Sequence, residues 1–213
     1  MFEHKLFESK NRSGEYLEYL YRTADEGTRL PLVLYIHGAG CRGSDINMLD
    51  SNSALLTIEK EVADKCVIAA PQCHCNTWFE LFDVLLEFID MMRTEDNVDT
   101  DRVYICGASM GGYTTWQVAM SRPEWFAAIA PVCGGGMYWN AGRLKNVPVW
   151  AFHGARDTTV LPEESLHMVK AVVNNGGNAR ITIYPEAQHN SWDLAFSEKE
   201  LWKWMFSQKR VCE

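Results

Sequence analysis

The chain has 213 residues, of which 47% are hydrophobic and 23% charged, a balance typical of a folded domain and unlike that of a disordered chain. Its 28 acidic and 20 basic residues give a net charge of −8, so a phosphate backbone would be repelled and no nucleic-acid partner is expected. Nowhere do about 18 apolar residues follow one another, so membrane insertion is not expected either. We expect a single domain over residues 1–213.

Seven cysteines, an odd number, are scattered through the expected strands and loops. A chain of this length folds without disulfides, so free thiols and a reducing compartment are expected. Residues 1–10 are polar and lack an apolar run of signal-peptide length, which predicts a cytoplasmic protein. A secreted protein whose signal has been removed is the alternative.

The cluster Cys73-His74-Cys75 invites a metal interpretation, but three ligands so close together cannot readily surround a zinc ion, and we expect loop residues there.

Strand-like apolar runs alternate with amphipathic helical runs, which predicts a mostly parallel sheet with helices on both faces. Residues 15–22 alternate and predict an early edge strand, and residues 31–36 predict a buried strand that ends before His37. The further expected strands are 66–70, 102–106, 126–132, 147–152 and 180–184. The expected helices are 48–63, 79–92, 112–121, 163–173 and 194–206.

A G-x-S-x-G pattern centred on Ser109 joins the expected strand 102–106 to the expected helix 112–121. In such a strand-to-helix turn the serine adopts a strained backbone conformation, and small residues at Gly107 and Gly111 leave room for the neighbouring strand and helix. The alternative is a glycine-rich turn that binds nothing. The flanking strand and helix favour Ser109 as a nucleophile.

A serine hydroxyl needs a general base, and His189 lies in the loop after the expected strand 180–184, where catalytic residues gather. The other histidines lie in a terminus, a polar helix face, the cysteine cluster or before a glycine at a strand end: His4, His167, His74, His37 and His153. We expect His37 and His153 to brace loops by hydrogen bonding, and we predict that His189 is the base.

Asp157 follows the expected strand 147–152 and therefore projects from the same sheet edge as Ser109 and His189. An ionised Asp157 would fix the tautomer of His189 and stabilise the imidazolium that forms when the serine attacks. The alternative is an aspartate that only caps its loop.

A developing oxyanion needs preorganised donors, and the backbone N–H of Met110 at the expected helix start is well placed to be one. The second donor is expected from the small residues of segment 37–40, with Ala39 first and Gly40 next.

Trp78, Trp139 and Trp192 are expected in loops after strand ends, on the same side as Ser109. They would form an aromatic rim that binds an aromatic acyl group or a sugar, and the alternative is that they pack the loops. Segment 133–139 is too short for a helical lid, which predicts an open site.

This set of residues resembles the α/β-hydrolase superfamily, in particular small single-domain serine esterases similar to feruloyl esterases, polyhydroxybutyrate depolymerases and phospholipase/carboxylesterase-like enzymes. The likeness runs from about residue 37 to residue 192, and the order Ser, Asp, His is the one this fold uses. The matching segments are His37-Gly38-Ala39-Gly40, Arg42-Gly43, Pro71-Gln72, Trp78-Phe79, residues 107–112, residues 153–157 and His189-Asn190-Ser191-Trp192.

The resemblance implies hydrolysis of a small-molecule carboxylic ester through an acyl-enzyme on Ser109, without a metal or an organic cofactor. A small or aromatic acyl ester, in one version linked to a polysaccharide, is the expected substrate. A peptidase similar to the prolyl oligopeptidase catalytic domain, or a thioesterase, would use the same three residues. A catalytically silent binding module would keep the fold alone. The oligomeric state is left open, a homodimer included.

Overall fold

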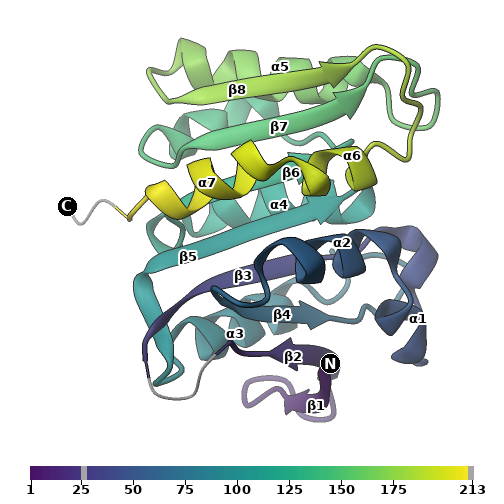
Figure 1. Cartoon of the computed structure of the whole chain (residues 1–213), viewed down its shortest axis with the longest axis vertical. Helices are drawn as coiled ribbons and strands as arrows, with labels where there is room; N and C mark the ends of the chain where they lie inside the picture. The colour runs from purple at the N-terminus through teal and green to yellow at the C-terminus, as the bar shows by residue number, and fades with distance from the viewer. Residues whose placement is uncertain (25–27, 211–213) are drawn as a thin grey trace.

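The computed structural model describes residues 1–24 and 28–210. Its centre is an eight-stranded sheet in the order β1-β2-β4-β3-β5-β6-β7-β8 (Figure 1). β1 is antiparallel to β2, and β2 to β4, whereas all other neighbours are parallel. The strands are β1 (Glu3–Glu8), β2 (Tyr16–Arg22), β3 (Leu30–Ile36), β4 (Val67–Pro71), β5 (Val98–Ala108), β6 (Ala128–Val132), β7 (Val149–Gly154) and β8 (Ala179–Tyr184).

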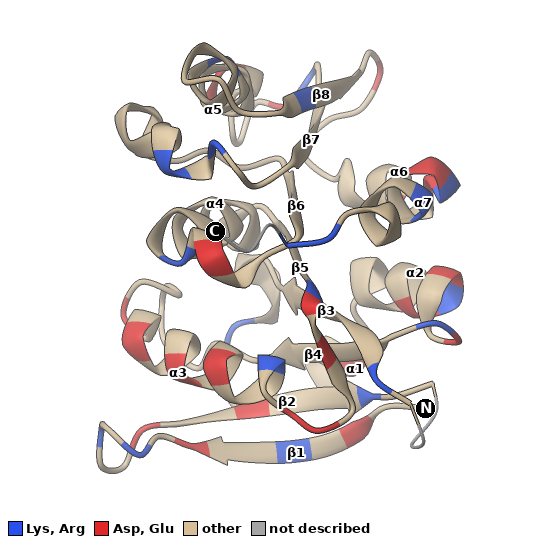
Figure 2. Cartoon of the chain, turned by 90° about the vertical axis from the view of Figure 1, so that its left-hand side faces the viewer, with Lys and Arg blue, Asp and Glu red and all other residues tan. Residues whose placement is uncertain are grey.

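Helices cover both faces of the sheet, as predicted (Figures 1 and 2). One face carries α3 (Phe82–Arg93), α4 (Met110–Ser121) and α5 (Pro162–Asn174); the other carries α2 (Ser53–Val62), α6 (Trp192–Ser197) and α7 (Lys199–Ser207). The connections hold α1 (Asn47–Asp50) and three 3₁₀ helices, η1 (Ala39–Cys41), η2 (Pro123–Trp125) and η3 (Tyr138–Leu144). Each face has its own apolar core. Within the described ranges, no helix is both long and apolar enough to cross a bilayer.

The register of the parallel strands brings their carboxyl ends together, at the arrowheads of β5, β7 and β8 in Figure 1. Ile36 at the end of β3 pairs with Gly107, and Ala108 at the end of β5 pairs with Val132. Further along the sheet, Gly154 pairs with Tyr184. Loops after these strands therefore meet at one sheet edge, where ligand sites of open α/β sheets form.

The N-terminal edge of the sheet differs from the prediction. The strand expected over residues 15–22 is β2, and it lies second in the sheet because β1 covers it. β1 carries four charged or ionisable side chains among its six residues and buries only Phe7, so hydrophobicity alone does not reveal it. Charged side chains on an edge strand also discourage pairing with a second chain.

Two predicted helices are each divided. The first breaks between α1 and α2 at Ser51 and Asn52, and the Asn52 side chain accepts a hydrogen bond from the N–H of Leu55 to cap α2. The second breaks at Glu198, whose backbone is extended between α6 and α7. Side-chain capping of the kind seen at Asn52 competes with continued helix, so an uninterrupted apolar period does not guarantee one helix.

Candidate active site

Ser109 lies in a tight turn between β5 and α4. Its φ of 56° and ψ of −118° belong to a region that residues other than glycine rarely adopt. Its N–H donates to the carbonyl of Val132 at 3.0 Å, which ties the turn to β6. A Cβ atom on Gly107 would lie 2.5 Å from the Gly111 oxygen, and one on Gly111 would lie 1.9 Å from the Ile36 oxygen. The strained turn and the need for small residues around it match the prediction.

His189 links the serine to a carboxylate. Its Nε2 lies 2.8 Å from Ser109 Oγ, and its Nδ1 lies 2.7 Å from Asp157 Oδ2. The side chain of Asp157 has no exposed surface, whereas His189 is 22% exposed and so can meet a substrate. The structure therefore brings the three predicted residues into one hydrogen-bonded row, although 80 positions separate the serine from the histidine.

The environment of Asp157 keeps its carboxylate ionised. Burial raises the pKa of Asp157, but the hydrogen bonds from His189 and from the N–H groups of Val160 and Thr159 together lower it more, so the pKa lies below its ordinary value. Both backbone donors reach Oδ1 at 2.9 Å. An ionised Asp157 can accept from the Nδ1–H of His189, which leaves Nε2 free to take a proton.

Gly154 lets the loop that carries His189 approach β7. A Cβ atom at this position would lie 2.2 Å from the carbonyl oxygen of Gln188 and 2.4 Å from that of Ala187. The loop is fixed there because Arg156 N–H donates to the Ala187 carbonyl at 2.9 Å. The strands β7 and β8 thus present Asp157 and His189 from adjacent positions.

The predicted oxyanion donors lie at two helix starts. Met110 is the first residue of α4 and Ala39 the first of η1, so neither N–H has an acceptor within its own helix. The loop of Ala39 is close to Ser109, since a Cβ on Gly38 would lie 3.4 Å from Ser109 Cβ. Gly40 faces open space, because a Cβ atom there would meet no atom within 4 Å.

The three tryptophans of the expected rim occupy different environments. Trp78 is fully buried, and its indole N–H donates to the carbonyl of His37 at 3.1 Å, so it supports the β3 loop from within and does not contact solvent. Its place on the rim was therefore a wrong expectation. Trp139 is 73% exposed in η3. Trp192 lies edge-on to the His189 ring, with ring centroids 5.6 Å apart.

The two histidines expected to brace loops do so. His37 Nδ1 lies 2.6 Å from the Gly38 carbonyl, and its Nε2 accepts from the N–H of Cys73 at 2.9 Å. Burial lowers the pKa of His37 to about 4, so the ring is neutral at pH 7. His153 contacts Ser165 Oγ and the carbonyl of Val160. In the cysteine cluster, His74 stacks on Tyr16, with ring centroids 4.9 Å apart.

Cys133, which the sequence reasoning did not single out, lies beside the hydrogen-bonded row of Ser109, His189 and Asp157. It follows β6 directly, and its φ is 41°. Its sulfur gathers with ligand atoms of Asp157 and His189 within 4.8 Å, the one such group of potential metal ligands in residues 1–24 and 28–210. Burial raises the pKa of the Cys133 thiol to about 12, so it stays protonated at pH 7. The sequence signal that could have pointed to Cys133 is its position directly after β6, the strand that lies between β5 and β7 in the sheet.

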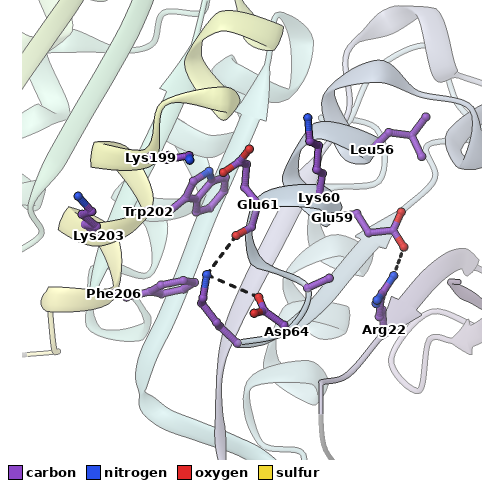
Figure 3. A pocket seen from close by; sticks show the side chains of 12 residues that line it. Arg22, Leu56, Glu59, Lys60, Glu61, Asp64, Lys199, Trp202, Lys203 and Phe206 are labelled. Carbon is purple, nitrogen blue, oxygen red and sulfur yellow. Dashed lines mark hydrogen bonds and ion pairs between the residues drawn. The ribbon is translucent and has the colours of Figure 1, made fainter.

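A separate hollow of about 820 Å³ lies between α2 and α7 (Figure 3). Its charges are largely matched locally: Arg22 pairs with Glu59, and Lys65 Nζ lies 3.6 Å from an Asp64 carboxylate oxygen. Residues 63–65 precede β4, so this hollow lies toward the amino edge of the parallel strands, away from Ser109. It contributes no group to the site.

The fold together with this row defines an α/β-hydrolase. The model of the dienelactone hydrolase family matches residues 66–199, more than half of the chain. The chain therefore belongs to the dienelactone hydrolase family.

Esterases are among the proteins to which this chain is similar, and acylaminoacyl peptidases share its fold. The bifunctional acetylxylan esterase/xylanase of Neocallimastix patriciarum is 28% identical over 147 residues, 65% of this chain and 21% of that protein. Poly(3-hydroxyalkanoate) depolymerase C of Paucimonas lemoignei is 33% identical over 70 residues, 29% of this chain and 17% of that protein. The crystal structure of a thermostable esterase matches with a TM-score of 0.88 at 32% identity, over 98% of this chain and 63% of that one. The chain spans about a fifth of the length of these two curated relatives.

Proposed function

We propose that the protein hydrolyses carboxylic esters through an acyl-enzyme on Ser109. The observation that carries the proposal is the continuous contact from Ser109 Oγ through the His189 ring to Asp157. Membership of the dienelactone hydrolase family and the likeness to a thermostable esterase support ester hydrolysis as the reaction.

In the first half of the reaction, Ser109 Oγ attacks the ester carbonyl carbon while its proton passes to His189 Nε2. The carbonyl oxygen becomes an oxyanion, which the N–H groups of Met110 and Ala39 stabilise, with Gly40 as the next choice. The tetrahedral intermediate then collapses. The alcohol leaves with the proton from His189, and the acyl group stays on Ser109.

In the second half, water attacks the acyl-enzyme and gives its proton to His189. The carboxylic acid leaves as the proton returns to Ser109 Oγ, so the enzyme ends unchanged. Asp157 keeps the imidazole in the tautomer that both halves need.

For the substrate, we propose a short or aromatic acyl ester, with polysaccharide-linked acyl groups as the leading class. The likeness to a bifunctional acetylxylan esterase/xylanase supports a carbohydrate-linked ester. The exposed Trp139 offers a flat apolar surface on which a sugar or an aromatic ring can stack. A panel of acetylated xylan, methyl ferulate and p-nitrophenyl esters of increasing chain length would rank these substrates.

The test of the reaction is turnover of p-nitrophenyl acetate by the wild-type chain and by Ser109→Ala. The substitution should reduce kcat by about 10⁴-fold to 10⁶-fold while substrate still binds. Equal turnover by both proteins would refute the proposal. Peptide p-nitroanilides and acyl thioesters in the same assay would reveal the peptidase and thioesterase alternatives.

We also propose that the protein works in a reducing, cytoplasmic compartment. The six described cysteines are free thiols, and most of them are buried. Fractionation of cells that produce the protein would test this, and recovery from the culture medium would contradict it.

A further inference from the structure

His153 contributes a second buried imidazole to the site. It is the penultimate residue of β7, and no part of it is exposed. Its Nε2 lies 2.9 Å from the carbonyl oxygen of Val160 and 3.2 Å from Asp157 Oδ2. Both neighbours are acceptors, because Asp157 is ionised. A ring nitrogen that faces only acceptors must carry a proton, so Nε2–H of His153 donates to the Val160 carbonyl and lies in close electrostatic contact with Asp157 Oδ2.

The other ring nitrogen of His153 faces a hydroxyl. Its Nδ1 lies 2.8 Å from Ser165 Oγ, which lies 2.7 Å from the carbonyl oxygen of Gly134. Ser165 Oγ donates its one proton to the Gly134 carbonyl, so it accepts from Nδ1 of His153. Both ring nitrogens of His153 therefore face acceptors, and the proton on Nε2 is the one that meets Val160 and Asp157.

With His153 included, the carboxylate of Asp157 has three hydrogen-bond donors and one further N–H in close contact. Oδ1 accepts from the N–H groups of Thr159 and Val160, and Oδ2 faces His189 Nδ1 and His153 Nε2. An ionised carboxylate offers about four acceptor directions, so the three hydrogen bonds and the His153 contact leave Asp157 little freedom to rotate. Rotation of the carboxylate would break contacts on both oxygens at once.

The His153 ring also holds the loop that supplies two of these donors. Val160 gives its N–H to Asp157 Oδ1 and receives the His153 Nε2–H at its carbonyl. The ring thus constrains Asp157 through its close contact with Oδ2 and through its hydrogen bond to the Val160 backbone.

We propose that His153 is a positioning residue of the active site, which holds Asp157 Oδ2 in line with His189. The inference rests on the proposed function. His153 is fully buried against Asp157 and does not reach a substrate. Its loss should therefore change the alignment of the base, and with it kcat, and should leave KM nearly unchanged.

The experiment compares three variants under saturating ester, with kcat expressed per active site from end-point labelling by a fluorophosphonate. His153→Asn keeps a polar group near Ser165 but does not reach Asp157, and kcat should fall about 10-fold to 100-fold, as for residues that orient a catalytic group. His153→Gln places an amide N–H near the Nε2 position, and kcat should return to within about 5-fold of wild type. Ser165→Ala, the matched control on the other side of the ring, should stay within about 3-fold.

A role in packing alone would give a different pattern. In that case His153→Asn would lower the amount of folded protein but leave kcat per active site at the wild-type value, which would overturn the proposal. Equal kcat losses in His153→Gln and His153→Asn, or a loss in Ser165→Ala as large as in His153→Asn, would overturn it too.

Nuclear magnetic resonance of the wild-type protein with ¹⁵N-labelled histidine gives a readout that needs neither turnover nor a folded His153 variant. The Nε2 of His153 should be protonated, and its resonance should move in Asp157→Asn. An unprotonated Nε2, or a resonance that Asp157→Asn leaves unchanged, would contradict the inference. Absence of ester turnover with these signals present would refute the proposed function alone.

Discussion

Two loops of the active site begin with the same dipeptide, His-Gly, at the end of a parallel strand. After β3, His37 binds only main-chain groups, the carbonyl of Gly38 and the N–H of Cys73. At the end of β7, His153 contacts a side chain, the carboxylate of Asp157. Both rings are fully buried.

The difference follows from what each loop has to present. The β3 loop presents main-chain N–H groups, so a neutral ring that fixes the backbone suffices. The β7 loop presents a buried charge, and a buried carboxylate must have all its acceptor positions satisfied. The same His-Gly pattern thus positions main-chain N–H groups in the β3 loop and the Asp157 carboxylate in the β7 loop.

The largest effect is expected in the β7 loop, from Asp157→Asn. An amide at this position can hold His189 in the wrong tautomer, so kcat should fall by about 10⁴-fold, which is about 5.5 kcal/mol of transition-state stabilisation. KM should change little. Steady-state kinetics with a p-nitrophenyl ester would measure both, and a kcat loss below about 10-fold would show that the carboxylate only caps its loop.

The next effect concerns the support of the β3 loop. Trp78→Ala removes a buried indole and its hydrogen bond to His37, and should lower the free energy of unfolding by about 3–5 kcal/mol. Trp139→Ala is the exposed control and should change it by less than about 0.5 kcal/mol. Urea unfolding would measure the free energy of unfolding of both variants. A Trp78→Ala protein as stable as the Trp139→Ala protein would mean that Trp78 does not support the loop.

A third test removes one oxyanion donor and leaves the loop intact. Ala39 is the first residue of η1 and follows an extended Gly38 (φ −77°, ψ 176°), a setting that proline tolerates. Ala39→Pro should reduce kcat by about 10²-fold to 10³-fold. Gly40→Ala keeps its N–H and has open space for a methyl group, so it should retain kcat within about 2-fold. A fully active Ala39→Pro protein would assign the donor to Gly40.

The smallest effect is a pH dependence of stability that comes from His37. Burial lowers the pKa of His37 from 6.5 to about 4, so between these values the unfolded chain binds a proton that the folded chain excludes. The free energy of unfolding should therefore fall as the pH drops from 6.5 to 4, by about 3 kcal/mol at most. His37→Gln keeps an acceptor for Cys73 and does not titrate, so its stability should depend less on pH across this window. Parallel slopes in the two proteins would place the acid sensitivity elsewhere.

The sequence alone predicted those features whose geometry a local pattern determines. The turn at Ser109 was predictable because a strand, two glycines and a helix start must coincide there, and larger side chains do not fit the contacts of Gly107 and Gly111. His189 and Asp157 were predictable because each follows a strand, and parallel strands end at one edge.

Other features depend on packing that no local pattern encodes. Trp78 follows a strand as Trp139 does, yet one is buried and the other exposed, since only the fold decides which indole the β3 loop covers. β1 was not predicted, because its charged and ionisable side chains obscure the alternation of apolar and polar residues that is typical of a strand. The sequence could not distinguish the contact between His153 and Asp157 from ordinary loop bracing. Outside a helix, a separation of four residues does not determine whether two side chains point toward each other.

The most direct test of the catalytic assignment is labelling with a fluorophosphonate, followed by mass spectrometry of the peptides. We predict one modified residue, Ser109, with ester turnover lost in proportion to the label and no labelling of Ser109→Ala. Ester turnover that persists after Ser109 is fully modified, or a label on another residue with Ser109 unmodified, would contradict the account.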